Sequence, residues 1–205
     1  TVVKLLARLY DPSGGQILID GVDLREYDVE DLRREIGVIF QDYMRYQMIL
    51  AENIGLGRVE ALDDRKRIER AAQLSLASEV AAGLEKGLDQ MIGRRFEGGV
   101  DLSGGEWQKV ALGRAYMRDA QILILDEPTA TLDARAEHRV FLRFAELTRG
   151  KMAVLISHRF STVRMADRIL VLQAGEIREE GTHEELIRHG GQYAELFELQ
   201  AAGYR

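Results

Sequence analysis

The chain has 205 residues, of which 46% are hydrophobic and 30% are charged, a balance typical of a soluble globular protein with one large domain or two small ones. The lack of cysteine excludes a disulfide framework and a cysteine-based metal site, and a net charge of -6 gives no basic footprint for nucleic acid. No apolar run approaches the roughly 18 residues that span a bilayer and no signal peptide is visible, so we expect any membrane role to act through a partner or further chain.

The first forty residues alternate between helical and strand patterns. Residues 1–10 are apolar at helical spacing, and residues 11–15, Asp-Pro-Ser-Gly-Gly, are typical of a turn. Residues 16–21 predict a strand closed by glycine, residues 29–34 a short helix, and residues 36–40 a second, buried strand.

The middle of the chain is helical in pattern. Its longest helical stretches cover residues 63–78 and 103–118. We therefore predict that residues 42–118 form a helical subdomain, which is inserted into an α/β core made of residues 1–41 and 119–205.

Further strands follow. Residues 122–125 are four apolar residues in a row, which indicates a strand buried on both faces, as in a parallel sheet. Residues 152–156 predict another such strand. Residues 168–173 and 176–180 flank Ala-Gly and predict a hairpin.

The C-terminal part of the chain is predicted to be helical. Thr182 and Glu185 have the spacing of a capping box that opens a short helix. Residues 192–201 predict a last amphipathic helix, with three side chains facing inward: Tyr193, Leu196 and Phe197.

Three of the apolar strands are each followed by polar residues. These residues are Gln41, the pair Asp126 and Glu127, and His158. In open α/β sheets, ligands bind at the carboxyl ends of the strands. The regularity therefore predicts one site across the edge of one sheet.

Two motifs follow one another in the second half of the chain. Residues 102–106 read Leu-Ser-Gly-Gly-Glu, and after a helical stretch residues 122–128 read Ile-Leu-Ile-Leu-Asp-Glu-Pro, followed by Leu-Asp at 132–133. This order resembles the ATP-binding cassette (ABC) ATPases, where the two pieces are the signature motif and Walker B. The resemblance covers essentially the whole chain. It implies an α/β P-loop NTPase (RecA-like) fold with a parallel-sheet core and an inserted α-helical subdomain.

The resemblance also implies ATP hydrolysis, with ATP and Mg²⁺ as cofactors. Asp126 resembles the Walker B aspartate that holds magnesium, and Glu127 resembles the general base that orients the attacking water. The structural alternative to these catalytic roles is that both carboxylates are simply solvated at the end of a strand. That explanation would be favoured for an isolated Asp-Glu pair.

The signature motif has a purely structural alternative as well. Ser103 and Glu106 have the spacing of a capping box, but this leaves Gly104 and Gly105 unexplained in the first turn of a helix. Paired glycines at a helix N-terminus let a phosphate approach the backbone. In the family, this loop meets the γ-phosphate of a nucleotide held by the opposite subunit. Glu106 stands where glutamine is commoner, and Trp107 where a basic residue often follows.

Three further residues match family positions. Gln41 matches the Q-loop, which touches magnesium and water, and His158 matches the switch histidine, which contacts the γ-phosphate. Asp133 matches the D-loop, which crosses the dimer interface. Without the other motifs, Gln41 would be interpreted as an ordinary surface residue and His158 as a residue with a structural role.

The start of the chain falls within the phosphate loop of the family pattern. By the resemblance, Thr1 is the last residue of that loop, and its glycines, lysine and magnesium-binding serine lie upstream. The amides and the lysine of this loop cradle the phosphates. We therefore expect residues 1–205 alone to be inactive as an ATPase.

Several stretches resemble ABC exporters rather than the soluble ABC ATPases of DNA repair and translation: residues 51–54, 157–164 and 180–186. The resemblance implies a second ABC ATPase domain as a dimer partner, a transmembrane domain that contacts residues 41–54, a place on the cytoplasmic face of the cell membrane, and no nucleic acid. Two alternatives stay open: a non-catalytic regulatory cassette, and a soluble ABC ATPase that acts on nucleic acid.

Overall fold

The computed structural model describes residues 1–127, 139, 142, 144–146 and 148–202. It divides into two compact units, Thr1–Val154 and Leu155–Arg205, and each unit is described here by itself. Among the described residues, no helix is long and apolar enough to cross a membrane.

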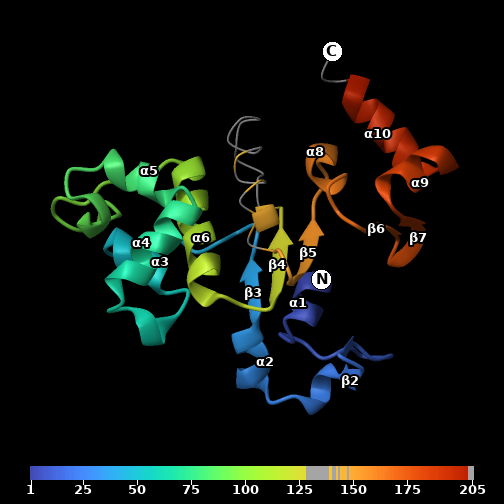
Figure 1. Cartoon of the computed structure of the whole chain (residues 1–205), viewed down its shortest axis with the longest axis horizontal. Helices are drawn as coiled ribbons and strands as arrows, with labels where there is room; N and C mark the ends of the chain where they lie inside the picture. The colour runs from blue at the N-terminus through green and yellow to red at the C-terminus, as the bar shows by residue number, and fades with distance from the viewer. Residues whose placement is uncertain (128–138, 140–141, 143, 147, 203–205) are drawn as a thin grey trace. The chain divides into compact units, whose positions relative to one another are not determined.

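A three-stranded sheet (Figure 1) has the order β3 (Ile36–Ile39), β4 (Ile122–Asp126) and β5 (Met152–Ile156), and the boundary between the two units falls within β5. Strands β3 and β4 are parallel, with Ile36 opposite Ile122 and Ile39 opposite Leu125. The middle residues of β4 are fully buried, as its unbroken apolar run predicts. The predicted α/β class with a parallel sheet is confirmed.

The third strand differs from the prediction in its burial. β5 forms over the predicted residues, but Met152 is 62% exposed and no residue of the strand is fully buried. The physical reason is its position, because β5 lies at an edge of this sheet and, among the described residues, only β4 has a neighbouring strand on both sides.

The N-terminal segment contains shorter elements than its pattern predicts. Helix α1 covers only Val2–Leu6. The predicted strand 16–21 forms only over β1 (Leu18–Ile19). The chain turns back at Asp20-Gly21, where both residues have positive φ, and β1 pairs with β2 (Val22–Asp23) in a small hairpin.

The chain then reaches the sheet through two helices. The short 3-10 helix η1 (Leu24–Glu26) leads into α2 (Val29–Glu35), which confirms the predicted helix. The side chain of Asp28 caps α2 by accepting hydrogen bonds from two amides of its first turn.

Six helices follow β3: α3 (Leu50–Gly55), η2 (Val59–Ala61), α4 (Arg65–Leu74), α5 (Ala77–Ala82), η3 (Gly87–Asp89) and α6 (Gly104–Arg118). The predicted helix 63–78 is broken in two, because Leu76 adopts a left-handed conformation with φ 63°. The predicted long helix at 103–118 is α6, with Ser103 as its N-cap. The limits of the subdomain, 42–118, stay a prediction.

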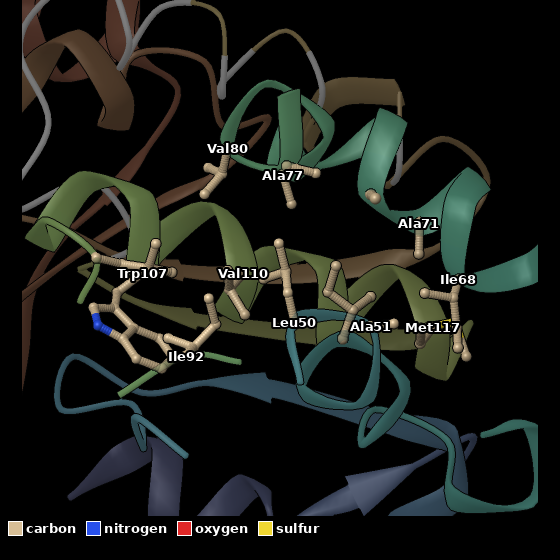
Figure 2. Packing of buried hydrophobic residues seen from close by; sticks show 14 residues of the cluster. Leu50, Ala51, Ile68, Ala71, Ala77, Val80, Ile92, Trp107, Val110 and Met117 are labelled. Atoms are coloured by element: carbon tan, nitrogen blue, oxygen red, sulfur yellow. The ribbon is translucent and has the colours of Figure 1, made fainter. Parts of the chain in front are cut away.

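These helices share one apolar core (Figure 2). It gathers buried side chains of α3, α4, α5 and α6 together with Ile92. Trp107 of α6 lies in this core beside Ile92, so an aromatic side chain is buried at the position after the Leu-Ser-Gly-Gly-Glu motif. The N-terminus of α6 is thereby anchored by packing.

The second unit is a hairpin with helices. Strands β6 (Ile169–Gln173) and β7 (Glu176–Gly181) pair antiparallel, as predicted. Three helices accompany them: α8 (Phe160–Val163), α9 (His183–His189) and α10 (Gln192–Ala202). The capping box of Thr182 and Glu185 is present at the start of α9. Leu196, predicted to face inward, is instead 44% exposed on α10.

Two glycines allow α6 to pack closely against its neighbours. A Cβ atom added to Gly57 would overlap the backbone carbonyl of Arg114, and one added to Gly113 would lie 3.2 Å from the side chains of Ile54 and Ser75. A clash with backbone is relieved only by moving a whole element, so Gly57 fixes the distance between α6 and the turn after α3.

We predict that Gly57→Ala lowers the free energy of unfolding by about 1–3 kcal/mol or more, because the added methyl group overpacks this contact. Gly83→Ala is the matched control, since its nearest new contact would be an ordinary 3.5 Å. Urea unfolding of the two variants measures the difference. Equal midpoints for both variants would contradict the close packing.

Candidate functional site

The carboxyl ends of β3 and β4 bring two predicted site residues together. The amide Nε2 of Gln41 donates a hydrogen bond of 3.0 Å to Oε2 of Glu127. The strand register explains this contact, because Ile39 and Leu125 are opposite each other and both residues lie two positions further on. Residues 86 apart in the chain therefore meet at one edge of the sheet.

Asp126 is the last residue of β4 and lies next to this pair. It is partly buried, and burial raises the pKa of its carboxyl above the ordinary value, with Glu127 and Asp42 adding to the effect by repulsion. A cation at this edge would relieve the repulsion between these carboxylates.

The backbone of Glu127 is unusual. Its φ is 47°, in the left-handed region, which costs a residue with a side chain about 1–2 kcal/mol. Such conformations gather at functional sites. The left-handed turn directs the side chain of Glu127 to Gln41 as the strand ends. The sequence carried no signal for this conformation.

The residues at this edge fit magnesium in part. Within the described part of the chain, no group of three or more His, Cys, Asp or Glu side chains could hold a metal ion. Mg²⁺ commonly binds through one or two protein oxygens together with substrate phosphates. The carboxylate of Asp126 and the amide oxygen of Gln41 are ligands of this type.

The Leu-Ser-Gly-Gly-Glu motif opens α6, and its capping box is real. Oγ of Ser103 accepts a hydrogen bond of 3.3 Å from the amide of Glu106, whose Oε2 accepts one of 2.8 Å from the amide of Ser103. The amides of Gly104 and Gly105 are the first two of a 15-residue helix, and they have no acceptor within that helix. The helix dipole adds positive potential there, so the capping role of Ser103 and Glu106 leaves the first two amides of the helix available to an anion.

Tyr43 links the two parts of the site. Its hydroxyl donates a hydrogen bond of 3.0 Å to the backbone carbonyl of Gly104. The segment that follows Gln41 is thereby tied to the first turn of α6. The sequence placed Tyr43 in a segment for partner contact and did not predict this link.

A partly buried arginine holds the rest of that segment. Arg114 of α6 donates to the backbone and side-chain oxygens of Asn53 at 2.9 and 2.8 Å, and to the carbonyl of Met44 at 2.7 Å. Its guanidinium also lies 4.9 Å from the ring centre of Tyr46. Burial lowers the pKa of Arg114 from its ordinary value, and these acceptors offset the cost of burying the charge.

Asn53 continues the network. It is fully buried, and its Nδ2 donates to the carbonyls of Tyr46 and Met48 at 2.9 and 3.3 Å. Sequence reasoning missed both Arg114 and Asn53, because an arginine on a helix and an asparagine next to a glutamate look like ordinary surface residues. Only the three-dimensional structure shows that the two side chains are paired.

Three predicted site residues remain: His158, Thr1 and Asp133. His158 is exposed at the start of the second unit, where the amide of Arg159 donates to Oγ of Ser157 at 3.0 Å. Thr1 is exposed at the N-cap position of α1 and makes no side-chain capping hydrogen bond. Asp133 lies outside the described residues.

Comparison with known proteins shows the family of this chain. Residues 1–130 match the sequence model of the family described as "ABC transporter". The chain therefore belongs to the ABC transporter family, and the family suggested by its motifs is confirmed.

Individual relatives agree with this assignment. The chain is 42% identical to an ATP-dependent lipid A-core flippase of Burkholderia orbicola (strain AU 1054) and 40% identical to the subtilin transport ATP-binding protein SpaT of Bacillus subtilis. Each match covers 98% of this chain and 33% of the relative. The chain thus spans about a third of the length of these curated relatives.

The fold also matches a solved structure, that of a bacterial Atm1-family ABC exporter with ATP bound. The TM-score is 0.89 at 36% sequence identity, and the match covers 98% of this chain and 34% of the other. The fold of this chain is therefore similar to that of part of an ABC exporter.

Proposed function

We propose that this chain is the ATP-binding and ATP-hydrolysing domain of an ABC exporter, which couples ATP hydrolysis to the transport of a substrate across a membrane. One observation carries the proposal: Gln41 donates to Glu127 beside the partly buried Asp126, where β3 and β4 end. An amide and two carboxylates at one strand edge suit phosphoryl transfer to water.

Each of the three residues has a distinct role in this proposal. Asp126 and the amide oxygen of Gln41 hold the magnesium ion of Mg-ATP, directly or through water. That ion, when bound, neutralises negative charge on the phosphates. Glu127 orients the attacking water and accepts its proton, and the hydrogen bond from Gln41 keeps its carboxylate at the strand edge.

The signature motif acts across a dimer of two ABC ATPase domains. The amides of Gly104 and Gly105, with the hydroxyl of Ser103, bind the γ-phosphate of a nucleotide held by the other domain, and Glu106 holds this loop in shape through the capping box. His158 contacts the γ-phosphate within its own domain, Asp133 lies at the interface, and Thr1 belongs to the phosphate loop. In this scheme ATP closes the dimer, and hydrolysis reopens it.

Residues 41–54 are the proposed contact with a transmembrane domain at the cytoplasmic face of the cell membrane. Met44 and Tyr46 are exposed there, although Arg114 fixes the backbone around them. Exposed apolar side chains on a fixed backbone suit a protein interface. Tyr43 joins the same segment to Gly104, so the helical subdomain of residues 42–118 would move with the membrane partner.

We predict that Glu127→Gln in the intact transporter binds ATP but hydrolyses it at least about a hundredfold more slowly, because the amide cannot accept a proton. The amide oxygen can still accept the hydrogen bond from Gln41, so the site keeps its shape. Nucleotide binding and phosphate release are measured on the same preparation. The exposed Glu85 provides a matched control, Glu85→Gln, which should hydrolyse ATP normally. Near-normal ATP turnover of Glu127→Gln would show that Glu127 is not the general base and that another residue has this role.

We predict that Gly104→Asp abolishes dimerisation and turnover but leaves ATP binding to the subunit's own phosphate loop intact. A carboxylate in the first turn interacts favourably with the helix dipole, so α6 should keep its stability. The same negative charge should repel the phosphate of a nucleotide. Gly104→Ala controls for the added side chain without the charge. Nucleotide binding, sedimentation and phosphate release are measured for both variants. If Gly104→Asp loses binding and turnover together, the cross-dimer role is wrong.

A further inference from the structure

The last helix of the second unit reaches back to the segment around His158. The side-chain amide of Gln200, on α10, makes two hydrogen bonds to the backbone there. Its Nε2 donates to the carbonyl of His158 at 3.0 Å, and its Oε1 accepts from the amide of Phe160 at 2.9 Å. One side chain thus holds the backbone on both sides of Arg159, as a neighbouring strand would.

Aromatic packing explains why Gln200 lies there. Tyr193, Phe197 and Gln200 are spaced by four and three residues, so they share one face of α10. The ring of Phe160 meets those of Tyr193 and Phe197 edge-on, with centroids 5.1 and 5.4 Å apart. His183 supports this face from α9, with Nδ1 2.9 Å from the hydroxyl of Tyr193.

The segment around His158 depends on such support. Helix α8 has only four residues, and its N-cap, Arg159, makes no side-chain capping hydrogen bond. A helix this short is not stable alone, and its first amides lack acceptors within the helix. Gln200 supplies the acceptor for the first of these amides, that of Phe160.

We propose that Gln200 is a positioning residue for His158, and that helix α10 thereby sets the orientation of the His158 side chain toward the γ-phosphate. The inference rests on the proposed function, in which His158 contacts that phosphate. The side-chain amide of Gln200 donates to the backbone carbonyl of His158. Without that amide, the backbone is less restrained and the imidazole of His158 is no longer held in the orientation that contacts the phosphate. Nucleotide binding is provided elsewhere, so the hydrolysis step is affected and the binding step is not.

The test uses the intact transporter with three variants. Gln200→Ala removes the side chain, whereas Gln200→Met keeps its length and packing but not its hydrogen bonds. Both should lower kcat by about tenfold, the order expected for two lost hydrogen bonds, and leave KM for ATP within about twofold. Leu199→Ala is the matched control, because Leu199 is 63% exposed on the same helix, and it should behave as wild type.

Hydrogen exchange of the peptide across residues 157–163 gives a readout that does not require turnover. Exchange should be faster in Gln200→Met than in wild type and unchanged in Leu199→Ala. Wild-type kcat in Gln200→Met, a parallel rise of KM, or equal exchange in both variants would overturn the positioning role alone. A wild-type transporter that releases no phosphate from ATP would instead overturn the proposed function, and the positioning role with it.

Discussion

The parallel pairing of β3 with β4 is the constraint on which the rest of the structure depends. The buried apolar face of β4 fixes its register against β3, because a slip by one residue would turn buried side chains toward solvent. That register alone brings Gln41 opposite Glu127, and the left-handed φ of Glu127 completes their contact. A site of polar residues therefore follows from the packing of apolar ones.

Helix α6 connects this edge of the sheet with the rest of the first unit. Trp107 and Gly57 fix its position by close packing, and Arg114 holds the segment that begins after Gln41. The first turn of α6 and that segment meet at Tyr43. Helix α6 therefore contacts, at its first turn and at Arg114, the segment that follows Gln41 and is proposed for membrane contact.

Much of this could be predicted from the sequence, because the relevant signals are local. Apolar runs gave the strands, and serine and threonine caps gave the starts of α6 and α9. Sequence reasoning failed where single residues in left-handed conformations turn the chain, as at Asp20, which shortens β1, and Leu76, which ends α4. It also missed the pairing of Arg114 with Asn53, since a contact between residues 61 apart depends on tertiary packing.

The central claim is that Gln41, Asp126 and Glu127 form the site where ATP is hydrolysed. A cryo-electron microscopy structure of the intact transporter, trapped with ADP, vanadate and Mg²⁺, tests it most directly. We expect the metal to be coordinated by Asp126 and Gln41, directly at about 2.0–2.1 Å or through water. The apical oxygen of vanadate should lie within hydrogen-bond reach of Glu127, about 2.6–3.2 Å. Vanadate bound away from Glu127, with that oxygen facing a different base, would contradict the account.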